Sequence, residues 1–362
     1  MGVPRLIGVD ALRGVAALMV LLYHGWFGPL INQVSPEAFW LAYPSWQGFT
    51  GVHLFLLLSG FCIHARAASA GRARPFLVFW RRRLTRLYPP YLAAVGLSFL
   101  VLSGPGQREL WIALAIHATF LLPFFPVTLW NSGNIVFWTL ALEEQLYLLY
   151  SPFLWLRKRL SLTRVVAVVL GATLLYRAAA VYWMQARTPM WSTPVEFLGA
   201  LPAQGGAAWL TLGPARWFEW VLGAALAERY FQGKLYFSRK AGLLSLLALA
   251  AALAGQWSQP GWVLTDPCWG LFYLGVCAWT LTREPERLSA RPLWKAASQV
   301  GLYSYSLYLV HVPVLDLLQP VLGTLVPQAL ALPLSCLLVL PCAYLFYLLF
   351  ERPALEWSRR LR

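Results

Sequence analysis

Charged residues are scarce in this sequence: Asp, Glu, Lys and Arg make up only 12% of its 362 residues. A soluble domain of this size carries about twice that fraction. The mean hydropathy is +0.59, and apolar runs of roughly 18 or more residues recur along the whole length. The strict alternation of a membrane β-barrel is missing as well. These features predict an all-α, polytopic membrane protein with a single membrane-embedded domain over residues 1–362.

Cysteine is also rare, and all five cysteines lie within apolar segments. Their odd number and wide scatter match neither a disulfide framework nor a metal site. No two histidines have the spacing of metal ligands on one helix. We therefore expect no metal, and we interpret the cysteines as small buried apolar side chains, at Cys62, Cys268, Cys277, Cys336 and Cys342.

Acidic residues are outnumbered by basic ones, 14 against 29, which gives a net charge of +15. A charge of this size can indicate a nucleic-acid partner. Here, however, Arg and Lys occur in short clusters between the apolar runs, as the positive-inside rule describes for cytoplasmic loops. We therefore expect contact with membrane lipid and no nucleic acid. The clusters are 66–86, 157–164, 229–240, 283–295 and 352–362.

The basic clusters also decide how the apolar segments cross the membrane. The chain leaves the cytoplasm after Arg86 and is back by Arg157, which requires an even number of crossings, yet three segments lie between. The segment 110–127 is short and ends among Pro and Gly, so we predict that it is re-entrant or interfacial. Ten transmembrane helices with both termini in the cytoplasm result, and the longest outer connection, 185–215, either covers a site or is a structural cap. The apolar segments are 7–27, 48–65, 85–103, 110–127, 135–156, 163–184, 216–228, 240–257, 262–281, 299–319 and 328–350.

The first span holds three ionisable residues, although a lipid-facing charge there would cost about 2.5 to 3.5 kcal/mol. Arg13 and His24 are eleven positions apart, which on a regular helix places them within about 20° of the same face and roughly 16 Å apart along the axis. Asp10 lies on the same side and can pair with Arg13. We predict that all three line a functional cavity. The alternative is that Asp10 and Arg13 only neutralise each other and His24 binds a backbone carbonyl.

Two adjacent carboxylates occur in "FWTLALEEQLYLLY". Glu143 and Glu144 differ by about 100° around a helix, and Glu143 shares its side with Thr139 and Tyr147. We expect Glu143 to pair with His24, because a carboxylate orients the ring and stabilises the imidazolium. The alternative for Glu143 is a structural hydrogen bond to a hydroxyl on another helix.

The stretch "YSYSLYLVHVPV" places His311 near mid-membrane, with Tyr308 one turn before it. A second intramembrane histidine, at a depth similar to the one in the first span, favours a site. The other three histidines, His53, His64 and His117, have no acidic residue beside them in the sequence. We expect those three to be packing residues.

The densest basic stretch is "RRRLTRLYPPY" at 81–91. Arg83 and Arg86 lie one helical turn apart and face the same way. Paired guanidinium groups of this kind can hold phosphates. The alternative is anchoring to anionic lipid, and only the combination with Arg13 favours a phosphate site.

These residues stand in segments that resemble acyltransferase family 3, membrane acyltransferases that modify bacterial surface glycans and some secondary metabolites. The likeness covers nearly the whole chain, in six blocks that follow the family's order: "VDALRGVAALMVLLYH", "FLLLSGF", "RRRLTRLYP", "FWTLALEEQLYLLY", "RWFEWVLGAALA" and "YSLYLVH". It implies ten spans, both termini inside, and a place in the bacterial cytoplasmic (inner) membrane. Some members carry an appended periplasmic hydrolase-like domain; we expect none in this chain and, if needed, a separate periplasmic partner.

The resemblance implies transfer of an acyl group, usually acetyl, from cytoplasmic acyl-CoA to a hydroxyl of a carbohydrate or glycolipid, with no permanently bound cofactor. Within that scheme each polar residue receives an expected role. The expected donor-binding residues are Asp10, Arg13, Arg83 and Arg86. The expected catalytic residues are His24 as general base, Glu143 as its partner, and His311. The expected acceptor or oxyanion contacts are Tyr308 and Arg216.

A proton-coupled transporter or a flippase of a lipid-linked sugar is the alternative from another functional class. Buried charges, broken segments and midplane histidines also occur in such proteins. The sequence, however, shows no repeated halves, and its basic inner end suits a phosphorylated donor. The enzyme is therefore the favoured interpretation.

Overall fold

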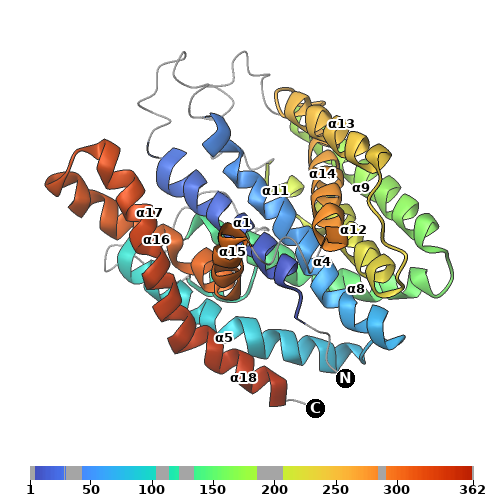
Figure 1. The fold of residues 1–362 in the computed structure, drawn as a ribbon, viewed down its shortest axis with the longest axis horizontal. Coiled ribbons are helices and arrows are strands. Elements are labelled where there is room, and N and C mark those ends of the chain that lie inside the picture. Colours follow the sequence, from blue (N-terminus) through green and yellow to red (C-terminus); the bar gives the residue numbers. More distant parts are fainter. Residues whose placement is uncertain are drawn as a thin grey trace.

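The computed structural model of the chain describes residues 5–27, 29, 43–102, 114–121, 134–185, 207–283 and 291–360. In these ranges the chain is helical and has no strand, as the composition predicts. Figure 1 shows the long helices side by side in one bundle. Six stretches are long and apolar enough to cross a membrane. They are Ile7–Phe27, Tyr43–Ala70, Phe76–Val101, Leu162–Gln185, Ser304–Leu325 and Gln328–Arg360.

The α-helices follow the apolar segments closely at most positions. They are α1 (Ile7–Leu22), α4 (Gly51–Ala70), α5 (Phe76–Leu102), α8 (Trp138–Arg157), α9 (Leu162–Gln185), α11 (Ala207–Leu210), α12 (Gly213–Phe231), α13 (Arg239–Gly255), α14 (Trp262–Arg283), α15 (Pro292–Leu302), α16 (Ser304–Leu325), α17 (Gln328–Phe346) and α18 (Arg352–Arg360). Short 3₁₀ or π turns adjoin several of them, namely η1 (Tyr23–Phe27), η2 (Gln47–Thr50), η4 (Ile135–Phe137) and η6 (Tyr347–Glu351).

Three of the expected boundaries are wrong. Helix α5 begins at Phe76, well before the expected start of the segment 85–103. The segment 299–319 is not one helix, because α15 ends at Leu302 and α16 begins at Ser304, with Tyr303 between them in a non-helical conformation. The last segment continues past 350 through a π turn into α18. Of the predicted re-entrant segment 110–127 only 114–121 is described, and most of the 185–215 connection lies outside the described residues.

Helices α4 and α12 form the closest crossing of the bundle, because glycine lets their backbones touch. A Cβ atom built on Gly60 would lie 1.9 Å from the carbonyl oxygen of Trp220, and one on Gly223 would lie 1.8 Å from that of Leu57. Small residues allow this approach between membrane helices. The small residue of "FLLLSGF" therefore faces α12. A second close approach of this kind involves α1, where Gly14 packs against the backbone of α15.

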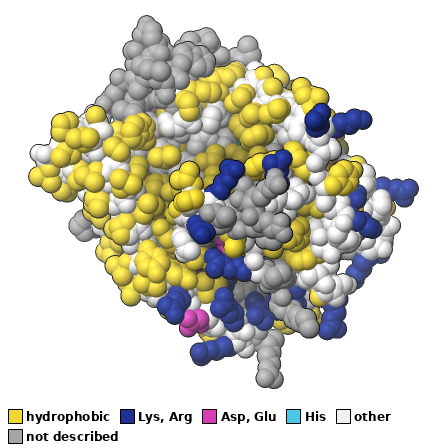
Figure 2. Space-filling model, viewed as in Figure 1, with side chains coloured by type: hydrophobic (Ala, Val, Ile, Leu, Met, Phe, Trp, Pro, Cys, Tyr) yellow, Lys and Arg dark blue, Asp and Glu magenta, His cyan; other side chains and the backbone are white. Residues whose placement is uncertain are grey.

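The C-terminal ends of α4, α8 and α12 meet at one end of the bundle. Glu228 of α12 accepts two hydrogen bonds from Arg157 of α8, at 2.9 and 2.8 Å, and contacts Nε2 of His64 of α4 at 3.1 Å. At the same end Arg82 donates to the backbone of Arg359, so α18 runs along α5. Figure 2 shows Lys and Arg side chains mainly over the lower and right parts of this face, and hydrophobic side chains mainly over its left and upper parts.

The α4–α12 crossing predicts a large effect for a small substitution. Gly60→Ala forces a methyl group against a backbone carbonyl, and overpacking of this kind costs about 1–3 kcal/mol of unfolding free energy. Gly96→Ala is the matched control, since a Cβ there meets nothing within 4 Å and alanine favours a helix. Thermal unfolding of the detergent-purified variants measures both. Equal melting temperatures for the two variants would contradict the close crossing.

Candidate active site

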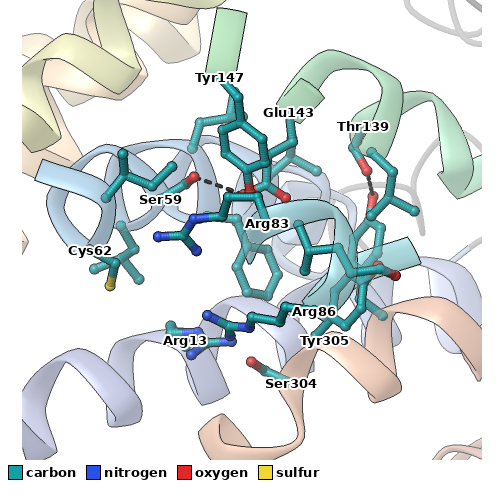
Figure 3. Close-up of a pocket in the computed structure, with 18 residues that line it drawn as sticks. Arg13, Ser59, Cys62, Arg83, Arg86, Thr139, Glu143, Tyr147, Ser304 and Tyr305 are labelled. Atoms are coloured by element: carbon teal, nitrogen blue, oxygen red, sulfur yellow. Dashed lines mark hydrogen bonds between the residues drawn. The ribbon is translucent and has the colours of Figure 1, made fainter. Parts of the chain in front are cut away.

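An inner cavity of about 160 Å³ lies between α1, α4, α5, α8 and α16. Arg13 of α1 and Arg83 and Arg86 of α5 all line it, so the fold brings the three arginines of the expected donor site together. Figure 3 shows their guanidinium groups pointing into the same space. Arg83 also lies over the rings of Phe79 and Tyr147, with centroid distances of 5.7 and 5.8 Å. These aromatic contacts fix the Arg83 side chain without neutralising it.

Glu143 lines the same inner cavity. Its Oε1 accepts a hydrogen bond from the Ser59 hydroxyl at 2.8 Å, as Figure 3 shows. The expected pair of Glu143 with His24 is therefore wrong, and the alternative of a hydroxyl on another helix is the one observed. Glu144 does not line this cavity. Asp10 does not line the cavity either. Its carboxylate accepts a hydrogen bond from Arg5 at 2.6 Å, so the expected pair of Asp10 with Arg13 is not observed.

Tyr308 and Val52 form a wall that the inner cavity shares with a second, outer cavity. The Tyr308 hydroxyl accepts a hydrogen bond from Oγ1 of Thr139 at 2.7 Å. Its own proton faces the carbonyl of Val136 at 3.3 Å, which is a long bond. Tyr308 and Val52 are the two residues that both linings have in common.

The outer cavity has a volume of about 350 Å³ and holds His24. Its lining combines aromatic side chains with a set of charged and polar groups, among them His53, Arg216 and Asp266. Concave sites that are mostly apolar and carry a few convergent polar groups are the usual form of small-molecule sites, and this volume lies within their range.

His24 and His311 are in contact, and their backbone partners fix both tautomers. Nδ1 of His311 faces the carbonyls of Tyr308 and Leu307 at 2.8 and 3.2 Å, so this nitrogen carries the proton and Nε2 accepts. Nδ1 of His24 lies 3.1 Å from the carbonyl of Val20 and 3.2 Å from Nε2 of His311, so it too carries the proton. Nε2 of His24 then has a free lone pair and bonds to no residue in the described ranges. His311 lines neither cavity and lies behind His24.

A π turn places His24 differently from the regular helix that the sequence suggests. Helix α1 ends at Leu22, and Tyr23–Phe27 forms a π turn. Such turns disturb the 3.6-residue period and are frequent at functional sites. Arg13 lines the inner cavity and His24 the outer one, so the two residues do not line one continuous cavity.

A buried ionic cluster on α4, α9, α12 and α14 was not predicted from the sequence. Oδ2 of Asp266 accepts from Arg177 and from Arg216, each at 2.5 Å. Nδ1 of His53 lies 2.6 Å from Oε1 of Glu219, and Arg216 forms a further ion pair with Glu219 at 2.9 Å. His53 is therefore no simple packing residue. The i, i+3 spacing of Arg216 and Glu219 in "RWFEW" is the one sequence signal of this cluster.

A third, basic cavity of about 170 Å³ adjoins the inner cavity and shares Arg83 and Arg86 with it. Three further arginines line it, namely Arg66, Arg74 and Arg82. Partial burial, and then the charges of neighbouring arginines, lower the pKa of Arg74. We refer to this cavity as the basic vestibule. Among the described residues no group of three or more His, Cys, Asp and Glu side chains is placed to hold a metal ion.

Comparison with known proteins places this geometry in a family. A family model described as an acyltransferase domain matches residues 6–348. The putative membrane-bound transacylase BcsY of Komagataeibacter xylinus is 26% identical over 376 residues, which cover 97% of this chain and 83% of that protein. No solved structure matches significantly.

Two further relatives are O-acetyltransferases. The peptidoglycan O-acetyltransferase OatA of Listeria monocytogenes is 26% identical over 357 residues, covering 88% of this chain and 51% of the relative. The O-acetyltransferase OatA of Staphylococcus aureus (strain NCTC 8325 / PS 47) is 32% identical over 167 residues, covering 41% of this chain and 24% of the relative. The chain thus spans about half or less of either OatA protein.

The ionic cluster predicts a large loss of stability from one isosteric change. Asp266→Asn removes the charge that Arg177 and Arg216 share, and the two guanidinium groups are only 1% and 7% exposed. Removing one partner of a buried ion pair costs about 3–5 kcal/mol. Glu356→Gln is the control, because its pair with Arg352 is 52% and 59% exposed and contributes less than about 0.5 kcal/mol. Thermal unfolding in detergent compares them, and similar melting temperatures would show that the cluster is not held by Asp266.

Proposed function

The chain belongs to the acyltransferase family whose domain matches residues 6–348, and we propose that this membrane enzyme moves an acetyl group from cytoplasmic acetyl-CoA to a hydroxyl of a cell-envelope or exported carbohydrate. The observation that carries the proposal is the pair of adjoining cavities. One is lined by three arginines, the other by a histidine with a free ring nitrogen, and both linings include Tyr308 and Val52.

The arginines of the inner cavity and the basic vestibule support a CoA donor. CoA carries a pyrophosphate and a 3′-phosphate, and guanidinium groups bind phosphates through paired, charge-assisted hydrogen bonds. Arg13, Arg83 and Arg86 share the inner cavity with the single carboxylate of Glu143. The vestibule adds positive charge further toward the basic end of the bundle. We assign the pyrophosphate to the inner arginines and the 3′-phosphate to the vestibule.

The orientation in the membrane follows from the same charges. The basic ends of α4, α8 and α12 meet, so the vestibule faces the side on which the positive-inside rule places Lys and Arg. We propose ten transmembrane helices with both termini in the cytoplasm of the inner membrane. The vestibule then opens to cytoplasmic acetyl-CoA, and the outer cavity opens toward the acceptor.

In the proposed reaction the pantetheine arm runs through the inner cavity and carries the thioester past Tyr308. Nε2 of His24 removes the proton from the acceptor hydroxyl, and the hydroxyl oxygen attacks the thioester carbonyl. The carbon–sulfur bond then breaks, and the CoA thiolate takes the proton from the His24 imidazolium. The Tyr308 hydroxyl can exchange its long bond to a backbone carbonyl for the developing oxyanion.

His311 acts in this scheme as a positioning residue. It accepts from Nδ1 of His24 and thereby keeps the His24 lone pair on Nε2, directed away from the bundle interior. The role expected for Glu143, orientation of the His24 ring, passes to His311. Glu143 and Ser59 remain on the wall beside the arginines, where they limit and position the donor.

The base assignment predicts that one ring nitrogen decides activity. His24→Asn keeps a side-chain N–H near the position of Nδ1 and removes Nε2, whereas His24→Ala removes both. Both variants should lose acetyl transfer by at least about 10²-fold while inserting and purifying normally. Radiolabelled acetyl-CoA and detergent-solubilised protein, with no membrane gradient, provide the assay. Wild-type-like transfer by His24→Asn would exclude Nε2 as the base, and absence of transfer by the wild type would favour a transporter.

The vestibule assignment predicts how the enzyme distinguishes donors. Arg13→Ala should raise the KM for acetyl-CoA and leave the KM for the acceptor unchanged. Arg74→Ala should remove a contact to the 3′-phosphate only. It should therefore weaken the binding of acetyl-CoA by about 5- to 30-fold and leave the binding of acetyl-dephospho-CoA unchanged. Arg159→Ala, an arginine outside all three cavities, is the control. Equal losses for both donors in Arg74→Ala would contradict the placement of the 3′-phosphate.

A further inference from the structure

We propose, on the basis of the function proposed above, that the outer cavity binds an uncharged sugar ring of the acceptor. The ring lies against an aromatic wall, and its hydroxyls bond to two polar atoms that the fold leaves open, Nε2 of His53 and Oδ1 of Asp266. Three independent features of the cavity support this assignment. They are its aromatic lining, the open pair of polar atoms, and the balance of its charges.

The aromatic lining supplies a flat apolar surface. Aromatic side chains from five separate parts of the chain line the cavity, and they are Tyr23, Trp46, Phe49, Trp138, Trp262 and Tyr308. Trp46 is held in place by ring contacts with Phe49 and Trp257. Trp138 begins α8 and is only partly buried, so its ring is available to a ligand. A sugar ring has apolar C–H faces and polar edges, which match aromatic walls that surround a few hydrogen-bonding groups.

The polar pair is open because each of its side chains is bound at its other end. Nδ1 of His53 lies 2.6 Å from Glu219, and Oδ2 of Asp266 accepts from two arginines. Nε2 of His53 and Oδ1 of Asp266 are 3.8 Å apart, too far for a hydrogen bond to each other. With Nδ1 of His53 donating to Glu219, Nε2 is an acceptor, as Oδ1 of Asp266 is. Each atom can therefore accept a hydrogen bond from a different hydroxyl of the ring. Within the described residues neither atom has another hydrogen-bond partner.

The charges of the four acidic and basic residues in the ionic cluster cancel, in contrast with those around the inner cavity. Arg177 and Arg216 carry two positive charges, and Glu219 and Asp266 carry two negative ones. The cluster can therefore donate and accept hydrogen bonds without attracting an ion. An uncharged polyhydroxyl ligand fits this surface, whereas a phosphorylated or acidic ligand fits the arginines of the inner cavity.

The same cavity contains His24, so a ring bound at His53 and Asp266 can present another hydroxyl to the proposed base. His53 and Asp266 then act as specificity-determining residues that select which hydroxyl faces His24. The ionic cluster takes no direct part in acetyl transfer, and its role is to hold the side chains of His53 and Asp266 in position.

Direct binding without donor tests the proposal. The probes are cellotetraose and chitotetraose, which are uncharged, and tetragalacturonate, which is anionic, titrated calorimetrically into the detergent-purified protein. We expect the uncharged probes to bind and tetragalacturonate to bind at least about tenfold more weakly. Trp138→Ala should weaken binding by about 5- to 10-fold and Trp138→Phe by less, because the phenylalanine keeps an aromatic face. Trp155→Ala, in the same helix but 55% exposed and outside the cavity, should bind as the wild type does.

His53→Asn tests the polar pair separately. Asparagine keeps a donor near the position of Nδ1, toward Glu219, and lacks an atom at Nε2. We expect oligosaccharide binding to weaken by about 3- to 10-fold, with an unchanged melting temperature. Unchanged binding in His53→Asn would overturn the role of Nε2, and equal binding of tetragalacturonate would overturn the preference for an uncharged ring.

Acetyl-CoA binding to the same samples separates this proposal from the one on which it rests. All the variants of the outer cavity should bind acetyl-CoA as the wild type does. If acetyl-CoA binds and no oligosaccharide binds, the sugar site is contradicted and the donor site stands. If the wild type does not bind acetyl-CoA, the proposed function itself is contradicted.

Discussion

Charge inside an apolar bundle has to be balanced by opposite charge. This protein has one buried group of charges that the fold balances and another that it does not. In the outer cluster Arg177 and Arg216 are balanced by Asp266 and Glu219, so the fold neutralises itself there. In the inner cavity three arginines face one carboxylate, so positive charge is left over. Burying unmatched charge is costly, which makes the inner cavity a place where an anionic ligand completes the structure. The chemical roles of the two cavities follow from this difference.

The second structural constraint is the position of Tyr308 at the boundary of the two cavities. Tyr308 belongs to both linings and lies next to the turn that holds His311. The same short stretch of α16 thus lies between the proposed donor and acceptor sites, and His311 within it contacts Nδ1 of His24. The first helical segment also contributes to both cavities, because Arg13 of α1 lines one and His24, in the π turn that follows, lines the other.

Hydropathy and one-turn spacing are local properties, and they were sufficient to predict most helices and the shared face of Arg83 and Arg86. Arg13 is distant in the sequence, and its place beside them was expected from the donor-binding role that the family resemblance implies. The partners of the histidines could not be predicted in this way. His53 and Glu219 are 166 residues apart, and His24 and His311 are 287 apart, so only the packing of α4 on α12 and of α1 near α16 brings them together. The π turn at Tyr23 has no clear sequence signal either, and it moves His24 away from the face that a regular helix predicts. Family membership, in contrast, was already visible in six ordered blocks.

The central claim is that a single path leads from the arginines past Tyr308 to His24. An experimental structure with a non-hydrolysable ketone analogue of acetyl-CoA tests it most directly. The account predicts phosphates on Arg13, Arg83 and Arg86, and the ketone carbon beyond Tyr308, close enough to His24 for a hydroxyl to lie between the carbon and Nε2. A ligand whose acetyl end stays on the arginine side of Tyr308, with His24 turned toward lipid or closed off by packed side chains, would contradict it.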